Sequence, residues 1–284
     1  MTTPLISADE LTTRLRDPSL RVVDTRWYLG RPGDGRRAYD AGHIPEAIFL
    51  DIDGDLALPP GPGLPGRHPL PDPAAFARRL EAAGIGDEHR VVACDDVGGW
   101  VAARLWWMLD SLGHPDVALL DGGIGAWQAA GGPLSMDVPS FPRGRLSLAP
   151  TWSRTIDRET LLGRLGSVTV LDARGAPRYR GETEPIDPVA GHIPTSLSAP
   201  TDGNLGQDGR FLAPGALRAR FAAFGVPSRP VVMSCGSGVA ACANALAMRV
   251  AGLPDPILYP GSWSDWSTAG FPVATGPEPG DPPA

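Results

Sequence analysis

Four segments of this 284-residue chain occur twice, in the same order in each half. The pairs are Val22–Arg26 with Val170–Arg174, Ala41–Pro45 with Ala190–Pro194, Val91–Asp95 with Val231–Cys235, and Gly122–Trp127 with Gly261–Trp266. The offset is 148 or 149 residues for the first two pairs and 140 or 139 for the last two, which indicates one length change between them. Such ordered matches point to an internal duplication. We therefore expect two domains of one kind, each with its own core.

Each copy alternates short apolar runs with longer segments of helical periodicity. RVVDTR, RVVACD and VTVLDAR are typical of buried strands, and DPAAFARRLEAAG and PGALRARFAAFG are typical of helices. Strands that alternate with helices usually pair in parallel. The sequence predicts an α/β fold in which each copy is a mainly parallel sheet flanked by helices.

The domain boundaries follow from the repeat and from composition. We expect an N-terminal domain over residues 1–136 and a C-terminal domain over residues 153–276. The segment between them, residues 137–152, has no sustained period and lies in a stretch rich in proline and glycine, so it is expected to be a linker. The ending, residues 277–284, is expected to be a disordered tail.

Composition narrows the function. The chain carries 25 basic and 32 acidic residues, a formal net charge of −7, which disfavours nucleic-acid binding because phosphates need a basic surface. No run reaches the roughly 18 apolar residues of a membrane span, and the first residues lack the basic and apolar parts of a signal peptide. We expect no membrane contact and a cytoplasmic location.

Cysteines and histidines are few. The three cysteines, Cys94, Cys235 and Cys242, do not suit a disulfide framework and form no CxxC pair of the kind that binds zinc. The histidines are scattered singly, so we expect no metal and no cofactor. Three of them, His68, His89 and His114, lie in turn-like contexts and are expected at the surface.

Cys235 stands where a predicted strand meets a predicted helix. The strand ends at Ser234, the loop reads Cys235-Gly236-Ser237-Gly238-Val239-Ala240, and a helical run follows from Ala241. Backbone N–H groups at a helix start favour anions, and they would lower the pKa of a thiol and hold a persulfide. The alternative is that Cys235 is a small buried apolar residue, as most free cysteines are.

A cysteine on such a loop also invites comparison with cysteine-dependent phosphatases. Their pattern needs an arginine six positions after the nucleophile, and Ala241 occupies that position. Without a guanidinium to hold the transferring phosphoryl group, phosphatase chemistry is poorly supported.

The sequence resembles the tandem-domain rhodanese-like sulfurtransferases over nearly its whole length. The loop CGSGV at Cys235–Val239 resembles CGSGVT of the 3-mercaptopyruvate sulfurtransferases, whereas thiosulfate-preferring relatives typically have CRKGVT. The other matching motifs are WYL at Trp27–Leu29, GHIP and FLDID within Gly42–Asp53, ARLWW at Ala103–Trp107, LDGG at Leu120–Gly123 and GSW at Gly261–Trp263. The resemblance implies two similar domains of which only the C-terminal one carries the nucleophile. Asp95 stands at the cysteine position of the first copy, so that domain is expected to be catalytically silent.

The resemblance also implies roles for single residues. Ser237 matches the loop serine, and Asp34 and His43 match an aspartate and a histidine proposed to relay a proton to the leaving enolate. His43 has a twin, His192, which equally favours a structural role in the loop.

Substrate binding is assigned on the same basis. Arg178 falls at the position of the family's arginine that binds the substrate carboxylate, and Arg180 is a plausible helper. Four residues of the cysteine loop complete the predicted substrate site. They are Gly236, Gly238, Val239 and Ala240.

The chain departs from the family pattern in two places. A second substrate arginine is expected shortly before GHIP but has no clear counterpart in Ile186–Val189, which leaves the choice of donor open. Ala240 replaces the usual threonine, which removes one hydroxyl beside the loop but none of its amides.

The leading hypothesis is a sulfurtransferase that moves sulfur from 3-mercaptopyruvate or thiosulfate through a Cys235 persulfide to cyanide, a thiol or a thioredoxin-like acceptor. Mercaptopyruvate is favoured because the loop lacks basic side chains that would attract the thiosulfate dianion. The main alternative is a persulfide carrier or interaction module with little turnover of small donors. A redox sensor would need a reversible bond between Cys235 and Cys242.

Overall fold

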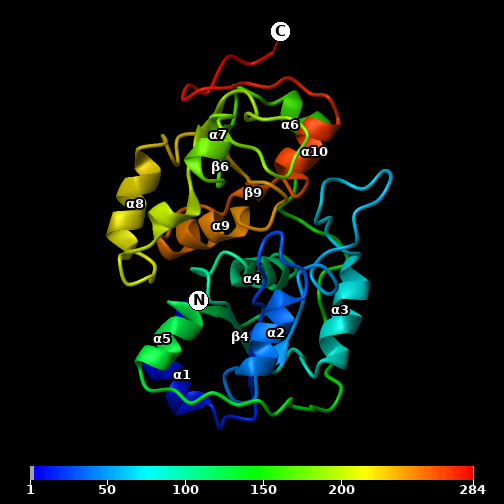
Figure 1. The fold of residues 1–284 in the computed structure, drawn as a ribbon, viewed down its shortest axis with the longest axis vertical. Coiled ribbons are helices and arrows are strands. Elements are labelled where there is room, and N and C mark those ends of the chain that lie inside the picture. Colours follow the sequence, from blue (N-terminus) through cyan, green and yellow to red (C-terminus); the bar gives the residue numbers. More distant parts are fainter. Residues whose placement is uncertain (1–2, 284) are drawn as a thin grey trace. The chain divides into compact units, whose positions relative to one another are not determined.

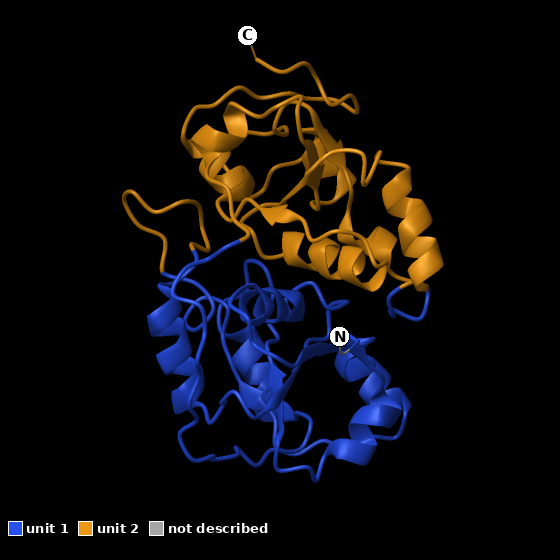
Figure 2. Ribbon diagram, turned by 180° about the vertical axis from the view of Figure 1, so that it is seen from behind, with its two compact units in different colours: residues 1–58, 70–153, 207–211 blue, residues 59–69, 154–206, 212–284 orange. Residues whose placement is uncertain are grey.

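A computed structural model describes residues 3–283 and divides the chain into two compact units (Figures 1 and 2). Unit 1 comprises residues 1–58, 70–153 and 207–211, and unit 2 comprises residues 59–69, 154–206 and 212–284. Each unit holds one sheet in which every pairing is parallel. The predicted α/β fold with two sheets related by duplication is confirmed.

Unit 1 contains a five-stranded sheet of order β1-β5-β4-β2-β3. Its strands are β1 (Leu5–Ile6), β2 (Leu20–Asp24), β3 (Ile48–Phe49), β4 (Arg90–Cys94) and β5 (Val117–Leu120). Its helices are α1 (Ala8–Arg14), α2 (Asp34–Ala41), α3 (Pro73–Ala82), α4 (Ala102–Ser111) and α5 (Gly123–Ala129). The strands are buried on both faces, which explains why they read as continuous apolar runs.

Unit 2 repeats this arrangement with a four-stranded sheet of order β7-β6-β8-β9. Its strands are β6 (Thr169–Asp172), β7 (Ser196–Ser198), β8 (Val231–Ser234) and β9 (Ile257–Leu258). Its helices are α6 (Arg158–Leu162), α7 (Ala176–Tyr179), the 3₁₀ helix η1 (Thr201–Asn204), α8 (Pro214–Ala222), α9 (Ala241–Val250) and α10 (Ser262–Thr268). The counterpart of β1 is reduced to a single parallel bridge between Thr155 and Leu258.

Two short segments fold with the other copy. Residues 59–69 belong in sequence to the first repeat but pack in unit 2, where Arg67 N donates a hydrogen bond to Ser264 Oγ at 3.1 Å. Residues 207–211 do the reverse, and Phe211 N donates to Asp121 Oδ1 at 2.8 Å in unit 1. Unit 1 therefore differs from the predicted first domain, residues 1–136, in that it lacks residues 59–69 and takes in residues 137–153 and 207–211.

The tail was expected to be disordered, but part of it is bound to unit 2. The Glu278 carbonyl lies 3.1 Å from His192 Nε2, and the Pro279 carbonyl accepts a hydrogen bond from Thr195 N at 2.6 Å. In unit 1 the Asp137 carbonyl, at the start of the predicted linker, lies 3.0 Å from His43 Nε2 in the same way. The tail is thus the counterpart of the linker in the second copy. It is held by hydrogen bonds to its backbone carbonyls, because it has few apolar side chains to pack.

Candidate active site

Cys235 lies where the sequence predicted, at the carboxyl end of β8 and before α9. It is 2% exposed, and its Sγ accepts a hydrogen bond from Gly238 N at 3.1 Å. The carboxyl ends of parallel strands are the usual place for a ligand site in such sheets. An amide directed at the sulfur favours its anionic form.

The segment that opens α10 holds the loop in this shape. Cys235 N donates to Ser262 Oγ at 3.0 Å, while Trp263 N and Ser264 N donate to the carbonyls of Cys235 and Gly236 at 3.0 and 2.9 Å. These bonds give the GSW segment, Gly261–Trp263, its role, which is to hold the backbone of the cysteine loop. They leave the backbone of Cys235 fixed, so the sulfur has one position from which to react.

Gly238 cannot be replaced without moving the loop. Its φ is +74°, and an added Cβ would lie 2.3 Å from the carbonyl oxygen of Pro260. Only glycine combines this left-handed backbone with so close an approach. Val239 and Ala240 follow in the turn that leads into α9, with Val239 buried and Ala240 partly exposed.

Ser237 is paired with a histidine that sequence reasoning placed at the surface. His68 Nδ1 lies 2.7 Å from Ser237 Oγ, and both residues are buried. His68 is carried by the 59–69 segment, directly after Arg67. The surface prediction is wrong for His68 and also for His89 and His114, which are equally buried. In the sequence, His68 differs from His43 in having no twin in the other copy, a property that it shares with His89 and His114.

The predicted relay between Asp34 and His43 is not formed. Asp34 begins α2 and His43 follows its end, so the length of the helix, about 12 Å at 1.5 Å per residue, separates them. Asp34 is paired with Arg31 and Arg37. A contact between residues nine positions apart was expected in a loop. Because α2 lies between them, Asp34 and His43 are too far apart for a contact.

His43 instead has the contacts of a structural residue. Its Nδ1 lies 2.9 Å from the Tyr39 carbonyl and its ring stacks on that of Tyr39 at 3.8 Å, with Nε2 near the Asp137 carbonyl. His192 stacks on Tyr179 at the same 3.8 Å, with Nδ1 2.8 Å from the Tyr179 carbonyl. The same arrangement in both copies, one of them without the cysteine, favours a role in the fold.

Arg178 and Arg180 have different surroundings. Arg178 donates from Nη2 to Glu184 Oε1 at 2.6 Å and to Asp187 Oδ2 at 3.3 Å, and an added Cβ on Gly236 would lie 3.5 Å from its Nη1. Arg180 is paired with the exposed Glu182, through bonds of 2.6 and 2.8 Å. The structure therefore brings Arg178 to the cysteine loop, and it does not bring Arg180 there.

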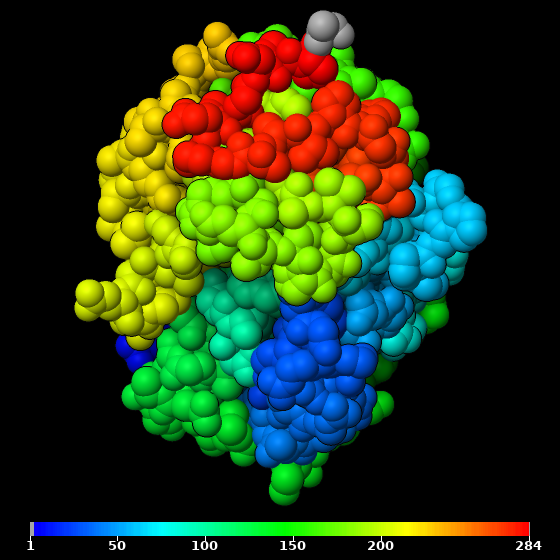
Figure 3. Space-filling view, turned by 45° about the horizontal axis from the view of Figure 1, so that its top comes forward, coloured from blue at the N-terminus to red at the C-terminus, as the bar shows by residue number. Residues whose placement is uncertain are grey.

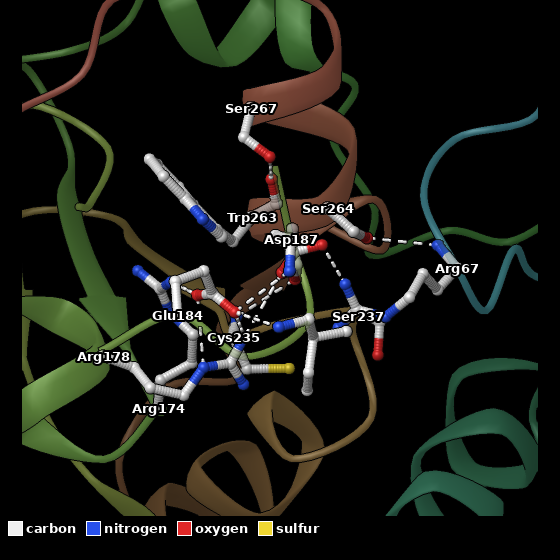
Figure 4. A network of polar contacts seen from close by, with 12 residues as sticks. Arg67, Arg174, Arg178, Glu184, Asp187, Cys235, Ser237, Trp263, Ser264 and Ser267 are labelled. Atoms are coloured by element: carbon white, nitrogen blue, oxygen red, sulfur yellow. Dashed lines mark hydrogen bonds and ion pairs between the residues drawn. The ribbon is translucent and has the colours of Figure 1, made fainter. Parts of the chain in front are cut away.

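A network of charged side chains surrounds the loop (Figure 4). Arg174 forms a buried pair with Asp172, whose Oδ2 accepts from Nη2 at 2.7 Å, and it also contacts Glu184. Burial acts to raise the pKa of Glu184, but the hydrogen bond and charge of Arg178, together with the amides of Asp187 and Ile186, outweigh it and hold that pKa below its usual range. Glu184 therefore stays ionised and keeps Arg178 beside the loop.

The first copy shows what such a loop binds. Asp95 stands where the second copy has Cys235, and its carboxylate accepts hydrogen bonds from the amides of Val97, Gly99, Val101 and Ala102 at 2.8 to 3.0 Å. Four amides around one buried carboxylate make an anion cradle. In the first copy, the protein's own side chain fills it.

None of the helices in residues 3–283 is long and apolar enough to cross a membrane. Within the same residues, no group of three His, Cys, Asp or Glu side chains is placed to hold a metal ion. The three cysteines are buried and none of them forms a disulfide in the same residues.

Comparison with known proteins agrees with this geometry. The family model described as a rhodanese-like domain matches residues 7–130 and again residues 157–269. The chain is 49% identical to a Pseudomonas aeruginosa protein named "Probable 3-mercaptopyruvate sulfurtransferase", over 96% of this chain and 98% of that protein. It is 38% identical to human 3-mercaptopyruvate sulfurtransferase, over 92% of this chain and 91% of the human one.

A solved structure shows the same likeness in three dimensions. The crystal structure of SseA from Escherichia coli, a 3-mercaptopyruvate sulfotransferase, matches with a TM-score of 0.80 and 31% identity, over 93% of this chain and all of that one. Two family matches in one chain, relatives of nearly equal length and a shared architecture leave one conclusion. The chain belongs to the tandem-domain rhodanese-like sulfurtransferases, the family of the 3-mercaptopyruvate and thiosulfate sulfurtransferases.

Proposed function

We propose that this chain transfers the sulfur of 3-mercaptopyruvate to cyanide, a thiol or a thioredoxin-like protein through a persulfide on Cys235. The observation that carries the proposal is the position of Cys235 Sγ, which accepts from Gly238 N inside a loop whose counterpart binds a carboxylate through four amides. A cradle of amides that holds a carboxylate suits a persulfide anion as well.

The reaction has two halves. The Cys235 thiolate attacks the donor sulfur, an S–S bond forms as the C–S bond breaks, and the carbon leaves as the enolate of pyruvate, which takes up a proton. The acceptor then attacks the outer sulfur, the S–S bond breaks, and Cys235 leaves as a thiolate. With cyanide the product is thiocyanate. The loop amides stabilise the anionic sulfur at both stages.

The first copy takes no part in this chemistry as a nucleophile. A carboxylate cannot form a persulfide, and Asp95 already occupies the cradle of its own loop. We therefore assign the catalytic role to the C-terminal copy and a silent role to the N-terminal one. We also propose a cytoplasmic location, because three cysteines without a disulfide among them suit a reducing compartment.

The proposal is tested by steady-state transfer to cyanide with the two donors compared by kcat/KM. We expect mercaptopyruvate to exceed thiosulfate by about tenfold or more, since one added favourable charge contact is worth that factor. A preference for thiosulfate would refute the donor assignment. No turnover with either donor, together with acceptance of sulfur from a partner protein, would replace the enzyme by a persulfide carrier.

His68 and Ser237 are proposed to deliver the proton that the enolate needs. We expect His68→Ala to lower kcat with mercaptopyruvate about a hundredfold, the usual range for loss of a general acid. When thiosulfate is the donor, the leaving group is sulfite, which needs no proton on carbon. Turnover of thiosulfate by His68→Ala should therefore fall much less.

The matched control for this prediction is His89→Gln, which alters a histidine of equal burial in unit 1. That variant should keep wild-type kcat with both donors. Equal losses of His68→Ala with the two donors would contradict the proton role and indicate that His68 only shapes the loop.

A further inference from the structure

Arg67 reaches the sulfur site from a segment that sequence places in the other copy. Residues 59–69 form an exposed loop of unit 2, seen in light blue in Figure 3, and Gly66 seats it against α10. An added Cβ on Gly66 would lie 2.5 Å from the Gly261 carbonyl, and Arg67 N bonds Ser264 Oγ. The backbone of Arg67 is thus held on the same helix start that holds the cysteine loop.

Two guanidinium groups meet at Gly236, the residue after the cysteine. An added Cβ on Gly236 would lie 3.0 Å from Arg67 Nη2, and 3.5 Å from Arg178 Nη1. A side chain at that position would press on the guanidinium of Arg67 and would be in ordinary contact with that of Arg178. The loop therefore carries two cations beside the reactive sulfur, neither of them part of the loop itself.

One internal carboxylate bridges the two cations (Figure 4). Asp187 Oδ1 accepts from Arg67 Nη1, and Asp187 Oδ2 accepts from Arg178 Nη2 at 3.3 Å. The side chain of Asp187 is 4% exposed, whereas that of Arg67 is 25% exposed. Burial raises the pKa of the Asp187 carboxyl, although both arginines oppose the rise. The protein's own carboxylate, bound between two guanidiniums, indicates that these groups are placed to bind the carboxylate of a ligand as well.

Arg67 and Asp187 can be reached from solvent. Arg67 and Asp187 line an open cavity of about 540 Å³ together with the 60–66 loop, Arg158, Ile186, Pro188 and part of α10, and Arg178 lies behind Asp187 rather than in the cavity wall. Asp187 stands in Ile186–Val189, the segment in which the sequence pattern led us to expect an arginine and shows none. A guanidinium, that of Arg67, is nevertheless present there, bound to the Asp187 carboxylate.

We propose that Arg67 and Arg178 together bind the carboxylate of the donor, and that Asp187 is an internal counter-ion that limits the positive charge offered to it. Because the two guanidiniums already share one carboxylate, the site attracts a donor with a single negative charge in preference to a dianion. Arg67 and Asp187 are then specificity-determining residues. This inference rests on the proposed function, since it concerns the donor of the same site.

The first test changes Arg67. We expect Arg67→Gln to raise KM for mercaptopyruvate about tenfold or more with kcat within about twofold, and Arg67→Lys to recover part of the loss, because it keeps the charge but not the fork. Arg249→Gln is the matched control, since Arg249 is 26% exposed and paired with Asp255 away from the loop. It should leave both constants unchanged.

The second test changes the charge of the site. Asp187→Asn should shift the ratio of kcat/KM for thiosulfate to that for mercaptopyruvate upward about tenfold, because one more positive charge favours the dianion. The double variant Arg67→Asp with Asp187→Arg exchanges the two charges. It should bind mercaptopyruvate with a KM within about threefold of the wild type and below that of Arg67→Gln.

The outcomes separate this inference from the proposed function. An unchanged KM in Arg67→Gln, or a fall in kcat alone, would overturn it, the latter by showing that Arg67 only positions His68. An unchanged donor ratio in Asp187→Asn, or a double variant no better than Arg67→Gln, would also overturn it. Each of these results requires an active wild type, whereas a wild type without cysteine-dependent transfer would refute the proposed function instead.

Discussion

Cys235→Ser is expected to lower kcat/KM for sulfur transfer at least about a thousandfold with either donor, with no loss of folded protein. A hydroxyl is too weak a nucleophile at neutral pH and forms no persulfide, while it fills nearly the same space. The amide of Gly238 keeps a partner, because an oxygen also accepts its hydrogen bond. Steady-state kinetics and circular dichroism of the same preparation check both parts.

The matched control is Cys94→Ala, which removes the buried thiol one residue before Asp95 in the silent copy. Burial raises the pKa of the Cys94 thiol well above its ordinary value, so that thiol stays protonated and unreactive. Cys94→Ala should keep wild-type turnover. Residual activity within about tenfold in Cys235→Ser, or a loss in Cys94→Ala, would refute the assignment of the nucleophile.

Asp95→Ala is expected to lower the free energy of unfolding of the protein by about 3 kcal/mol, the upper range for one buried polar deletion. Its carboxylate satisfies four amides at once, and alanine would leave them buried without that acceptor. The loss is a matter of stability alone, because Asp95 lies outside the proposed chemistry. Urea unfolding followed by tryptophan fluorescence measures it.

Cys235→Ala, at the equivalent position of the second copy, is the comparison for Asp95→Ala. Its Sγ accepts a hydrogen bond from the amide of Gly238, so we expect a loss of only about 1 kcal/mol. Asp95→Asn keeps one acceptor oxygen and should fall between the two. If Asp95→Ala were as stable as Cys235→Ala, the carboxylate would not be what holds the first loop together.

The duplication explains how much of the fold was predictable. Residues that pack a sheet are needed in both copies, so the strand and turn segments recur and the α/β class follows from them. The pairing of Asp24 with Arg26 also recurs as Asp172 with Arg174, with bonds of 2.7 Å in each copy. Such repeated features belong to the fold, whatever chemistry they stand beside.

The site was less predictable because its residues lie where the copies differ. His43 is four positions after Tyr39, but His192 is thirteen positions after Tyr179, and the added segment holds Glu184 and Asp187. The second copy is shorter than the first before Tyr179 by nearly the same number of residues. The two changes cancel, so the offsets between the copies do not show the insertion. Local patterns place Cys235, Ser237 and Arg178, which lie on or beside regular elements.

His68 and Arg67 escaped prediction for a related reason. The 59–69 segment is a loop rich in proline and glycine, and its composition resembles that of any exposed connection. Its partners in unit 2 are more than a hundred residues away in sequence, so no short-range pattern records them. The absence of a twin in the second copy separates His68 from His43, but His89 and His114 share it, so the sequence alone does not single out His68.

The most direct test of the account is the intact mass of the protein after reaction with 3-mercaptopyruvate in the absence of an acceptor, followed by peptide mapping. The account predicts one added sulfur atom per chain, located on Cys235, absent from Cys235→Ser and lost when cyanide is added as thiocyanate forms. An unmodified Cys235, or added sulfur on Cys94 or Cys242 while turnover proceeds, would contradict it.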